Sequence, residues 1–154
     1  MVMTLEPIIC EHPFFRGLEE RHVTLIVGCA KNVRFDEGEL VFHEGEPANT
    51  FYVIREGRIS IEFVVPGRPN ANIQTIGKGE VLGWSWLFPP YRWHFNARAV
   101  VPVRALAFDG KCLREKCAQD TSLGYQLMSR TASILIERLQ ATRLQLLDLY
   151  GPHS

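Results

Sequence analysis

The spacing of hydrophobic and polar positions changes twice along the chain. Between residues 12 and 31 the apolar side chains recur every three or four positions, and this spacing predicts a helix. From residue 32 to 109 they form short runs that alternate with polar residues, as is typical of half-buried strands. From 111 to 150 the helical spacing returns. It predicts a short helix over 111–118 and a long one over 122–150, which Gly151-Pro152 would end.

Glycine-marked turns divide the middle stretch roughly every ten residues, which favours a sandwich, jelly roll or small barrel over a parallel sheet. The expected strands cover 33–35, 40–42, 51–54, 59–65, 73–76, 81–82, 95–100 and 103–108. We therefore expect one mainly β domain over 1–154. In this domain an N-terminal helix over 12–31 and C-terminal helices over 111–150 flank a β-roll over 32–109.

The long helix carries two apolar stripes. One steps alternately by three and four, which is the spacing of a coiled-coil seam. It consists of Ala132, Leu135, Leu139, Thr142, Leu146 and Leu149. The other consists of Leu127, Ile134, Leu144, Leu147 and Tyr150. One stripe can cover the sheet while the other meets a partner helix, or a single wide face can dock on its own domain. Because the helix is longer than a small domain usually covers, we favour a homodimer through the first stripe, termed the seam.

Composition limits the cellular locations and the classes of partner that we expect for this chain. The 17 basic and 17 acidic residues balance, so charge gives no reason to expect nucleic acid or an anionic membrane as a partner. The apolar runs are too short to span a bilayer, and the N-terminus lacks the pattern of a signal peptide, so we expect a cytoplasmic protein. None of the cysteines forms a C-x-x-C pair, and all are expected to be buried or inert thiols. They are Cys10, Cys29, Cys112 and Cys117.

No pattern in the sequence supports catalysis or a metal site. A metal-dependent jelly roll needs several histidines and a carboxylate, typically with an H-x-H pair on a strand. The histidines here are scattered, at His12, His22, His43, His94 and His153. Cys10 and His12 lack a third residue that would orient them as a nucleophile and base. We therefore expect no catalytic residue, no metal ligand and no cofactor.

One segment, residues 83–98, concentrates the aromatic side chains. It holds all three tryptophans, Trp84, Trp86 and Trp93. Pro89-Pro90 bars a long helix or a central strand across its middle, because proline lacks an N–H and fixes φ. A short helical turn can form at 85–87, with Ser85 as its N-cap and its free N–H groups available to an anion. The segment is therefore either a ligand pocket or a well-packed bend in the core.

Several motifs and the order of elements carry a family resemblance. The motifs are Pro13-Phe14-Phe15-x-Gly17-Leu18, Phe35-x-x-Gly38-Glu39-x-Val41-Phe42-x-Glu44-Gly45-Glu46-Pro47-Ala48 and Phe51-Tyr52-Val53-Ile54-x-x-Gly57. Together they resemble the cyclic-nucleotide-binding domain of the catabolite-activator family. The resemblance implies a double-stranded β-helix, or jelly roll, with a pocket helix between its sixth and seventh strands and a long C-terminal helix. The family's transcription factors carry a helix-turn-helix domain after that helix. No basic recognition helix appears in residues 1–154, so we expect no direct contact with nucleic acid.

The same resemblance implies a ligand site whose polar groups are replaced. In the family, a Gly-Glu pair holds the ribose, and an arginine followed by a small residue holds the cyclic phosphate. Here the glycine is Gly83, the glutamate position holds Trp84, and Trp93 and His94 stand where the arginine pair belongs. An unsatisfied polar group of a buried ligand costs about 1–3 kcal/mol. The expected ligand-binding residues are Gly83, Trp84, Ser85, Trp86, Arg92, Trp93 and His94.

Two hypotheses follow. The first is a non-enzymatic sensor that binds cAMP or cGMP in an atypical way, or another small planar or anionic ligand, and signals through its C-terminal helix to a partner protein in trans. The second is a domain that has lost its small ligand and serves as a dimerisation or interaction module. The pocket distinguishes them: Trp84 and Trp93 filling it favours the module, whereas a cavity with Arg92 at its mouth favours the sensor.

Overall fold

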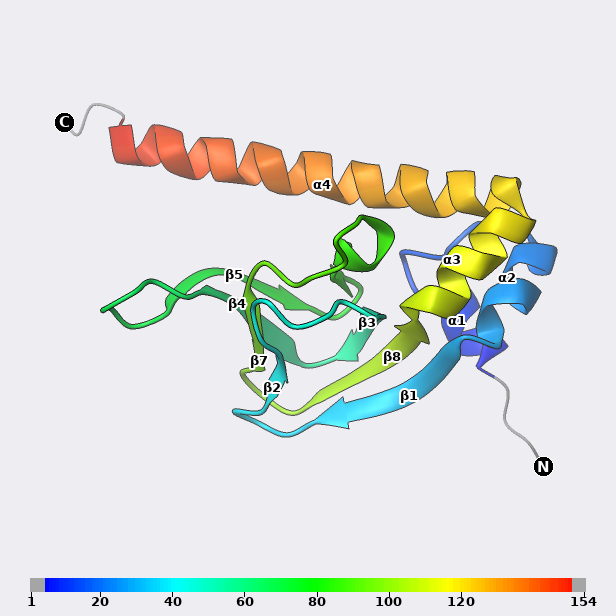
Figure 1. Cartoon of the computed structure of the whole chain (residues 1–154), viewed down its shortest axis with the longest axis horizontal. Coiled ribbons are helices and arrows are strands. Elements are labelled where there is room, and N and C mark those ends of the chain that lie inside the picture. The colour runs from blue at the N-terminus through cyan, green and yellow to red at the C-terminus, as the bar shows by residue number, and fades with distance from the viewer. Residues whose placement is uncertain (1–4, 151–154) are drawn as a thin grey trace.

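Two antiparallel sheets of four strands each form the body of the structure, a computed structural model that describes residues 5–150 (Figure 1). The strand order is β1-β8-β3-β6 in one sheet and β2-β7-β4-β5 in the other. The strands are β1 (Ala30–Phe35), β2 (Leu40–Phe42), β3 (Thr50–Glu56), β4 (Arg58–Phe63), β5 (Ala71–Gly77), β6 (Val81–Leu82), β7 (Asn96–Ala99) and β8 (Val103–Asp109). Each sheet joins strands that are distant in the sequence, such as β1 and β8. This arrangement confirms the predicted mainly β roll.

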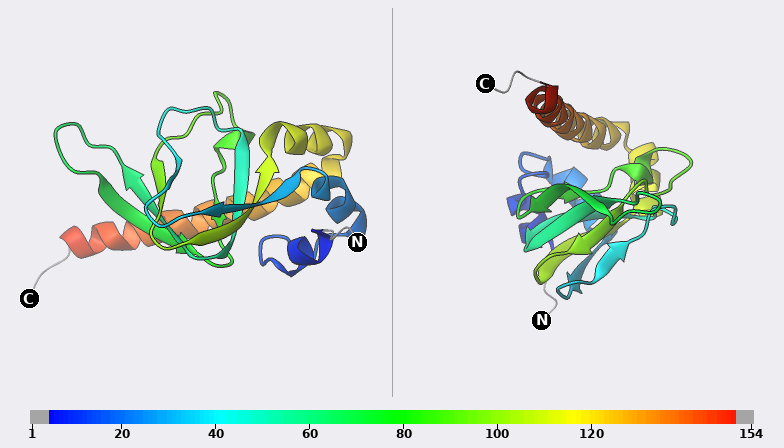
Figure 2. Two further views of the ribbon diagram at one scale, coloured as in Figure 1. Left: turned by 90° about the horizontal axis from the view of Figure 1, so that it is seen from below. Right: turned by 90° about the vertical axis from the view of Figure 1, so that its left-hand side faces the viewer.

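The helices lie at one end of the roll and along one side of it. They are α1 (Glu6–Glu11), α2 (Glu20–Val27), the single 3₁₀ turn η1 (Ser85–Leu87), α3 (Gly110–Gln119) and α4 (Thr121–Tyr150). Figure 1 shows α1, α2 and α3 gathered at one end, while α4 runs the length of the molecule. In the end-on view of Figure 2, α4 lies beside the roll as a separate rod. The predicted C-terminal helices are confirmed to within two residues, and Gly151-Pro152 lies outside the described residues.

The single helix predicted over residues 12–31 is wrong. The structure has two short helices with turns between them, and residues 30 and 31 already belong to β1. Pro13 has no N–H to donate within a helix, and Gly17 adopts a φ of +87°, which a helix does not accommodate. The side chain of His12 also accepts a hydrogen bond from the N–H of Phe14 (3.1 Å), which holds the turn in place of helical bonding.

The apolar side chains form two cores, one on each face of the β1-β8-β3-β6 sheet, because successive strand residues point to opposite faces. The outer core lies under the helices and includes Phe15, Ile26, Phe51, Val53, Trp86, Leu106, Phe108, Leu113, Leu123 and Leu127. The inner core fills the roll between the two sheets and includes Phe42, Ile54, Ile59, Ile76, Leu82, Trp93, Phe95, Ala97, Val103 and Ala105. The aromatic segment contributes to both, so it is packed into the body on two sides.

Two of the cysteines are joined. Cys29, just after α2, forms a disulfide with Cys112 of α3, and their Cα atoms are 5.7 Å apart. The prediction of four free thiols is therefore wrong for this pair, because the fold brings together residues separated by 83 positions in the sequence. Cys10 is exposed rather than buried, and Cys117 is half-buried. Burial and the nearby carboxylate of Asp120 raise the pKa of the Cys117 thiol, which favours its unreactive protonated form.

α4 is attached to the body as far as Arg138, and its remaining residues are not. Leu123 and Leu127 are buried, and Ile134 packs against the outer core. The seam residues Ala132, Leu139, Leu146 and Leu149 are exposed, and Leu135 is half-buried. In the second stripe, as far as the side chains are described, Leu127 and Ile134 cover the body, whereas Leu144 and Leu147 are exposed. The side chain of Tyr150 lies outside the described residues.

His12 generates a prediction about pH. Its Nδ1 accepts from Phe14, so its Nε2 carries the proton and donates to the carbonyl of Ile54 (3.1 Å). Burial lowers the pKa of His12 from 6.5; the hydrogen bond to Ile54 opposes this, and the charge of Arg16 adds to it. The unfolded chain therefore binds a proton first as pH falls, so stability is full above pH 6.5 and declines below it.

We expect His12→Gln to be less stable than the wild type at pH 7.5 by about 1–2 kcal/mol. The difference should shrink between pH 6.5 and 5, because the variant has no histidine there to protonate. Urea unfolding at several pH values measures this. His43→Gln, at an exposed position, is the control. Parallel stability profiles for the wild type and His12→Gln would contradict the assignment.

Candidate functional site

The aromatic segment leaves β6 and returns to β7 by way of η1. The predicted helical turn at 85–87 is confirmed. Its predicted N-cap is wrong, because Trp84 occupies the capping position and no side chain there caps the turn. Ser85 is the first residue of the turn and is buried. Because the turn is a single one and its first residue is buried, it does not favour an anion site, which stays a prediction.

Trp93 is the centre of the segment. Its side chain is only 4% exposed. Its ring stacks face to face on that of Phe42, with ring centroids 3.7 Å apart and planes 4° apart. Gly83 lies against the same ring, since a Cβ at that position would overlap Trp93. The position at which the resemblance places a phosphate-binding arginine is thus occupied by a buried indole.

Main-chain hydrogen bonds fix Trp93 in this place. Its N–H donates to the carbonyl of Glu46 (3.0 Å), and its carbonyl accepts from the N–H of Gly45 (2.8 Å). The neighbouring Arg92 is exposed, and its guanidinium donates to the carbonyl of Gly45 (2.8 Å). His94 is exposed as well. The turn after β2 therefore holds both Trp93 and Arg92, the former inside the roll and the latter on its surface.

The other two tryptophans lead to the C-terminal helices. Trp86 is 1% exposed in the outer core, and its carbonyl accepts a hydrogen bond from Arg114 of α3 (2.7 Å). Arg114 also lies over the ring of Tyr91, 4.2 Å from its centroid. Trp84 is half-buried beneath α4, where Arg138 lies over its ring at 4.8 Å. The segment is thus held by α3 on one side and by α4 on the other.

Arg138 is the polar group that joins α4 to this segment. Besides covering Trp84, it donates to the carbonyl of Val81 (2.8 Å). Burial lowers the pKa of its guanidinium, while the carboxylates of Glu80 and Glu137 act in the opposite direction. A guanidinium that retains its charge over an indole face forms a favourable cation–π contact, which is stronger when the pair is partly desolvated.

The expected site residues therefore face different parts of the molecule. Gly83 and Trp93 lie together in the inner core, Ser85 and Trp86 are buried, Trp84 lies under α4, and Arg92 and His94 face outward. Sequence reasoning missed their main partners, which are Phe42, Arg114 and Arg138. The sequence contained one clue to these contacts. Each C-terminal helix carries an arginine on the face that is turned toward the body, and a charge in that place needs a partner.

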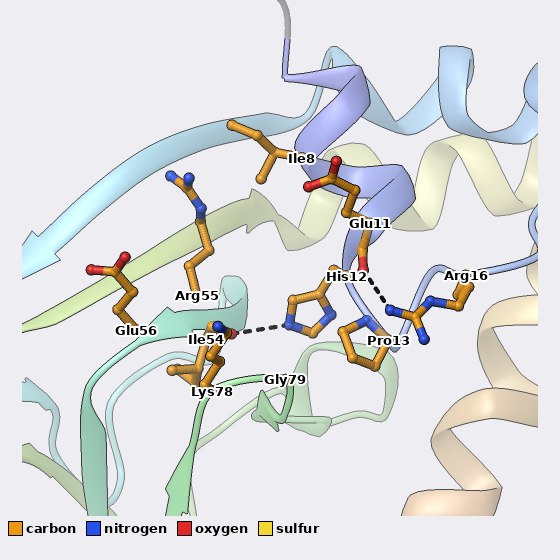
Figure 3. Close-up of a pocket in the computed structure, with 10 residues that line it drawn as sticks. All are labelled: Ile8, Glu11, His12, Pro13, Arg16, Ile54, Arg55, Glu56, Lys78 and Gly79. Carbon is orange, nitrogen blue, oxygen red and sulfur yellow. Dashed lines mark hydrogen bonds between the residues drawn. The ribbon is translucent and has the colours of Figure 1, made fainter.

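A hollow of about 520 Å³ lies elsewhere, between the N-terminal turn, β3 and the β5–β6 turn (Figure 3). His12 lies in its wall with both ring nitrogens hydrogen-bonded, and Arg16 donates to the carbonyl of Glu11 (3.2 Å). Within residues 5–150, no three histidine, cysteine or acidic side chains gather closely enough to hold a metal ion. Over the same range, no helix combines the length and the apolar character that crossing a membrane requires.

The packing of Gly83 against Trp93 predicts the effect of adding a methyl group. Gly83 has a φ of +90°, and its Cβ would overlap the indole. Gly38 has a similar φ of +83° with no atom within 4 Å of its Cβ, so Gly38→Ala measures the cost of the backbone conformation alone. We expect Gly38→Ala to cost about 1–2 kcal/mol and Gly83→Ala about 1–3 kcal/mol more.

Urea unfolding at equilibrium measures both variants. In a Trp93→Ala background, the additional cost of Gly83→Ala over Gly38→Ala should largely disappear, since the overlapping ring is gone. An equal cost for the two glycine substitutions in the wild-type background would mean that Trp93 does not lie over Gly83.

Comparison with known proteins shows which family profile and which relatives the chain is similar to. A profile described as "Cyclic nucleotide-binding domain" matches residues 32–120. A CRP-like cAMP-activated global transcriptional regulator of Mycobacterium tuberculosis is 29% identical over 146 residues, which cover 94% of this chain and 63% of the regulator. The chain thus spans less than two thirds of that relative.

Solved structures show the same fold at lower identity. A cyclic nucleotide-binding domain from Methylobacillus flagellatus superposes with a TM-score of 0.83 at 15% identity, covering 97% of this chain and 88% of that one. The catabolite activator protein of Thermus thermophilus superposes with a TM-score of 0.71 at 21% identity, covering 90% and 63%. With its β-roll, its helical turn between β6 and β7 and the family profile over residues 32–120, the chain belongs to the cyclic nucleotide-binding domain family.

Proposed function

We propose that this domain is a non-enzymatic regulatory module that works without a bound cyclic nucleotide. Trp93 occupies the place of the ligand, and the exposed seam of α4 joins two copies of the chain. The observation that carries the proposal is the burial of Trp93 against Phe42 and Gly83. The module hypothesis predicts such filling, whereas the sensor hypothesis expects a cavity with Arg92 at its mouth.

Two features oppose the binding of a cyclic nucleotide: the side chain of Trp93 occupies the space, and the polar groups that would hold the ligand are missing. A cyclic nucleotide entering the roll would have to displace an indole that is stacked on Phe42. Two hydrogen bonds also fix the main chain of this residue. Burying an aromatic side chain of this size is worth several kcal/mol, as large-to-small substitutions at buried aromatic positions cost about 3–5 kcal/mol. The ligand would then lack its usual arginine and glutamate, because Trp93 and Trp84 stand in their places. Arg92 cannot substitute without leaving the carbonyl of Gly45.

The surface of α4 supports the second half of the proposal. Beyond Arg138, the side chains of Leu139, Leu146 and Leu149 are 51%, 49% and 71% exposed, respectively. Together with Thr142 they recur at the alternating three- and four-residue spacing of a coiled coil, and association of two such helices would remove them from water. A second copy of this chain presents an identical seam, so a symmetric helix pair fits the pattern.

One observation favours the sensor hypothesis as a second candidate function. Arg138 joins α4 to Trp84 and to the carbonyl of Val81. A change in the position of the aromatic segment would therefore displace the helix. In such a sensor, a small planar or anionic ligand would displace Trp93 and shift α4 against a partner protein in trans. The regulators and binding domains similar to this chain are consistent with either route.

The oligomeric state tests the proposed function. Sedimentation equilibrium at micromolar concentrations should show a dimer without any added nucleotide. Leu139→Glu or Leu146→Glu should shift the protein to monomer, with dimer affinity at least tenfold lower, because each would place charges in an apolar seam. Leu144→Glu is the matched control: it is also an exposed leucine of α4, and it lies about 140° around the helix from Leu139.

Circular dichroism should show all three variants folded, since these side chains face solvent in the monomer. A wild-type protein that is monomeric at these concentrations would contradict the proposal. So would a dimer that Leu144→Glu disrupts as strongly as Leu139→Glu, and so would a dimer that forms only after cAMP is added.

A further inference from the structure

Two arginines lie side by side on the outer face of the β1-β8-β3-β6 sheet. Arg34 of β1 and Arg104 of β8 are directly opposite partners in the antiparallel register. Their neighbours Val33, Val103 and Ala105 pack toward the inner core, which places both arginine side chains on the other face of the sheet. Both are exposed. Directly opposite side chains in an antiparallel pair are close enough to interact, and like charges in this arrangement are unfavourable.

A third arginine comes to the same place from β3. The register between β3 and β8 shifts between Ile54 and Glu56, so Arg55 is the additional residue at an irregularity of the ladder. Such a bulge changes the direction of a side chain. The guanidinium of Arg55 donates to the amide oxygen of Asn32 on β1 (3.0 Å), and therefore reaches across β8. Arg55 also lines the larger hollow beside His12, and Figure 3 shows its guanidinium pointing away from the His12 ring.

These side chains enclose a small depression. It has a volume of about 210 Å³ and is lined by Asn32, Val33, Arg34, Arg55 and Arg104, a set we term the arginine hollow. Apart from Val33, the lining consists of cationic groups and one amide. A phosphate or diphosphate group fits in this volume, and guanidinium groups bind phosphate oxygens through paired, charge-assisted hydrogen bonds.

The charge of the arginine hollow is poorly balanced by the protein. The carboxylate of Glu56 lies 3.9 Å from Arg104, and both side chains are more than half exposed, so this ion pair is weak. Within residues 5–150, no hydrogen bond or ion pair engages the guanidinium of Arg34. Other arginines of the chain bind main-chain carbonyls, as Arg114 and Arg138 do. Since the chain as a whole carries equal numbers of basic and acidic residues, this excess is local.

We propose that the arginine hollow binds a small phosphate-bearing anion. Such an anion would lie between Arg34 and Arg104, offset their mutual repulsion, and accept hydrogen bonds from Arg55 as well. The site lies on the outer face of the sheet, whereas Trp93 lies in the inner core. Anion binding there is therefore independent of whether the aromatic segment admits a nucleotide.

Isothermal titration calorimetry at low ionic strength tests the proposal with three probes: inorganic phosphate, inorganic diphosphate and adenosine 5′-monophosphate. We expect a submillimolar dissociation constant for diphosphate, and at least tenfold weaker binding to Arg34→Gln and to Arg104→Gln. Arg68→Gln, in the exposed loop between β4 and β5, is the control and should bind within twofold of the wild type. Binding of the inorganic anions alone would identify a free phosphate, and binding of the monophosphate alone would identify a phosphate ester.

A thermal melt provides a second readout that does not need a ligand. Without any anion, Arg34→Gln should melt about 1–3 °C higher than the wild type, because it removes an unfavourable like-charge pair. Added diphosphate should raise the melting temperature of the wild type and of Arg68→Gln, and leave Arg34→Gln nearly unchanged. The proposal is overturned if none of the probes binds the wild type, or if Arg34→Gln and the wild type respond equally.

Discussion

The stacking of Trp93 on Phe42, above Gly83, is the contact on which the rest of this domain depends. It occupies the inner core at the end of the roll where the aromatic segment crosses. Because Trp93 faces inward, Arg92 must face outward, and it is held there by the carbonyl of Gly45. The same contact requires glycine at position 83, which combines a positive φ with closeness to the indole. In the proposed account, the side chain of Trp93 fills the space that the family ordinarily reserves for a ligand.

Arginines on the C-terminal helices join α3 and α4 to the aromatic segment. Arg114 binds the carbonyl of Trp86 within the aromatic segment, and Arg138 binds that of Val81 just before it. The two guanidinium groups also cover the rings of Tyr91 and Trp84. Farther toward the start of α4, Arg130 donates to the carbonyls of Phe14 and Arg16 (2.7 and 2.9 Å). These polar contacts attach α4 to the body as far as Arg138 and leave the rest of the helix free. A well-packed aromatic segment and an anchored helix are consistent with the proposed module, in which the seam of α4 is exposed whether or not a ligand is bound.

Much of the fold could be predicted from the sequence, because glycine-marked turns and alternating strands are local signals. The long helix and the helical turn at η1 were likewise predictable from periodicity. The break between α1 and α2 was harder to predict, because it depends on the hydrogen bond that His12 accepts within the turn and on the missing N–H of Pro13. The pairing of Cys29 with Cys112 could not be predicted, because it follows from the packing of α3 beside α2 rather than from spacing. In the candidate site, the replacement of the arginine by Trp93 was visible in the sequence. Its burial on Phe42, and the roles of Arg114 and Arg138, required tertiary contacts.

The most direct test of the central claim is a calorimetric titration of the protein with cAMP and with cGMP. Using Arg34→Gln for this titration keeps the outer face of the sheet from contributing to the signal. With Trp93 in the place of the ligand and no arginine or glutamate to hold the ribose and phosphate, neither nucleotide should bind with a dissociation constant below about 1 mM, a free energy of about −4.1 kcal/mol. Micromolar binding of either nucleotide to this folded protein would show that Trp93 yields its place, and would contradict the account.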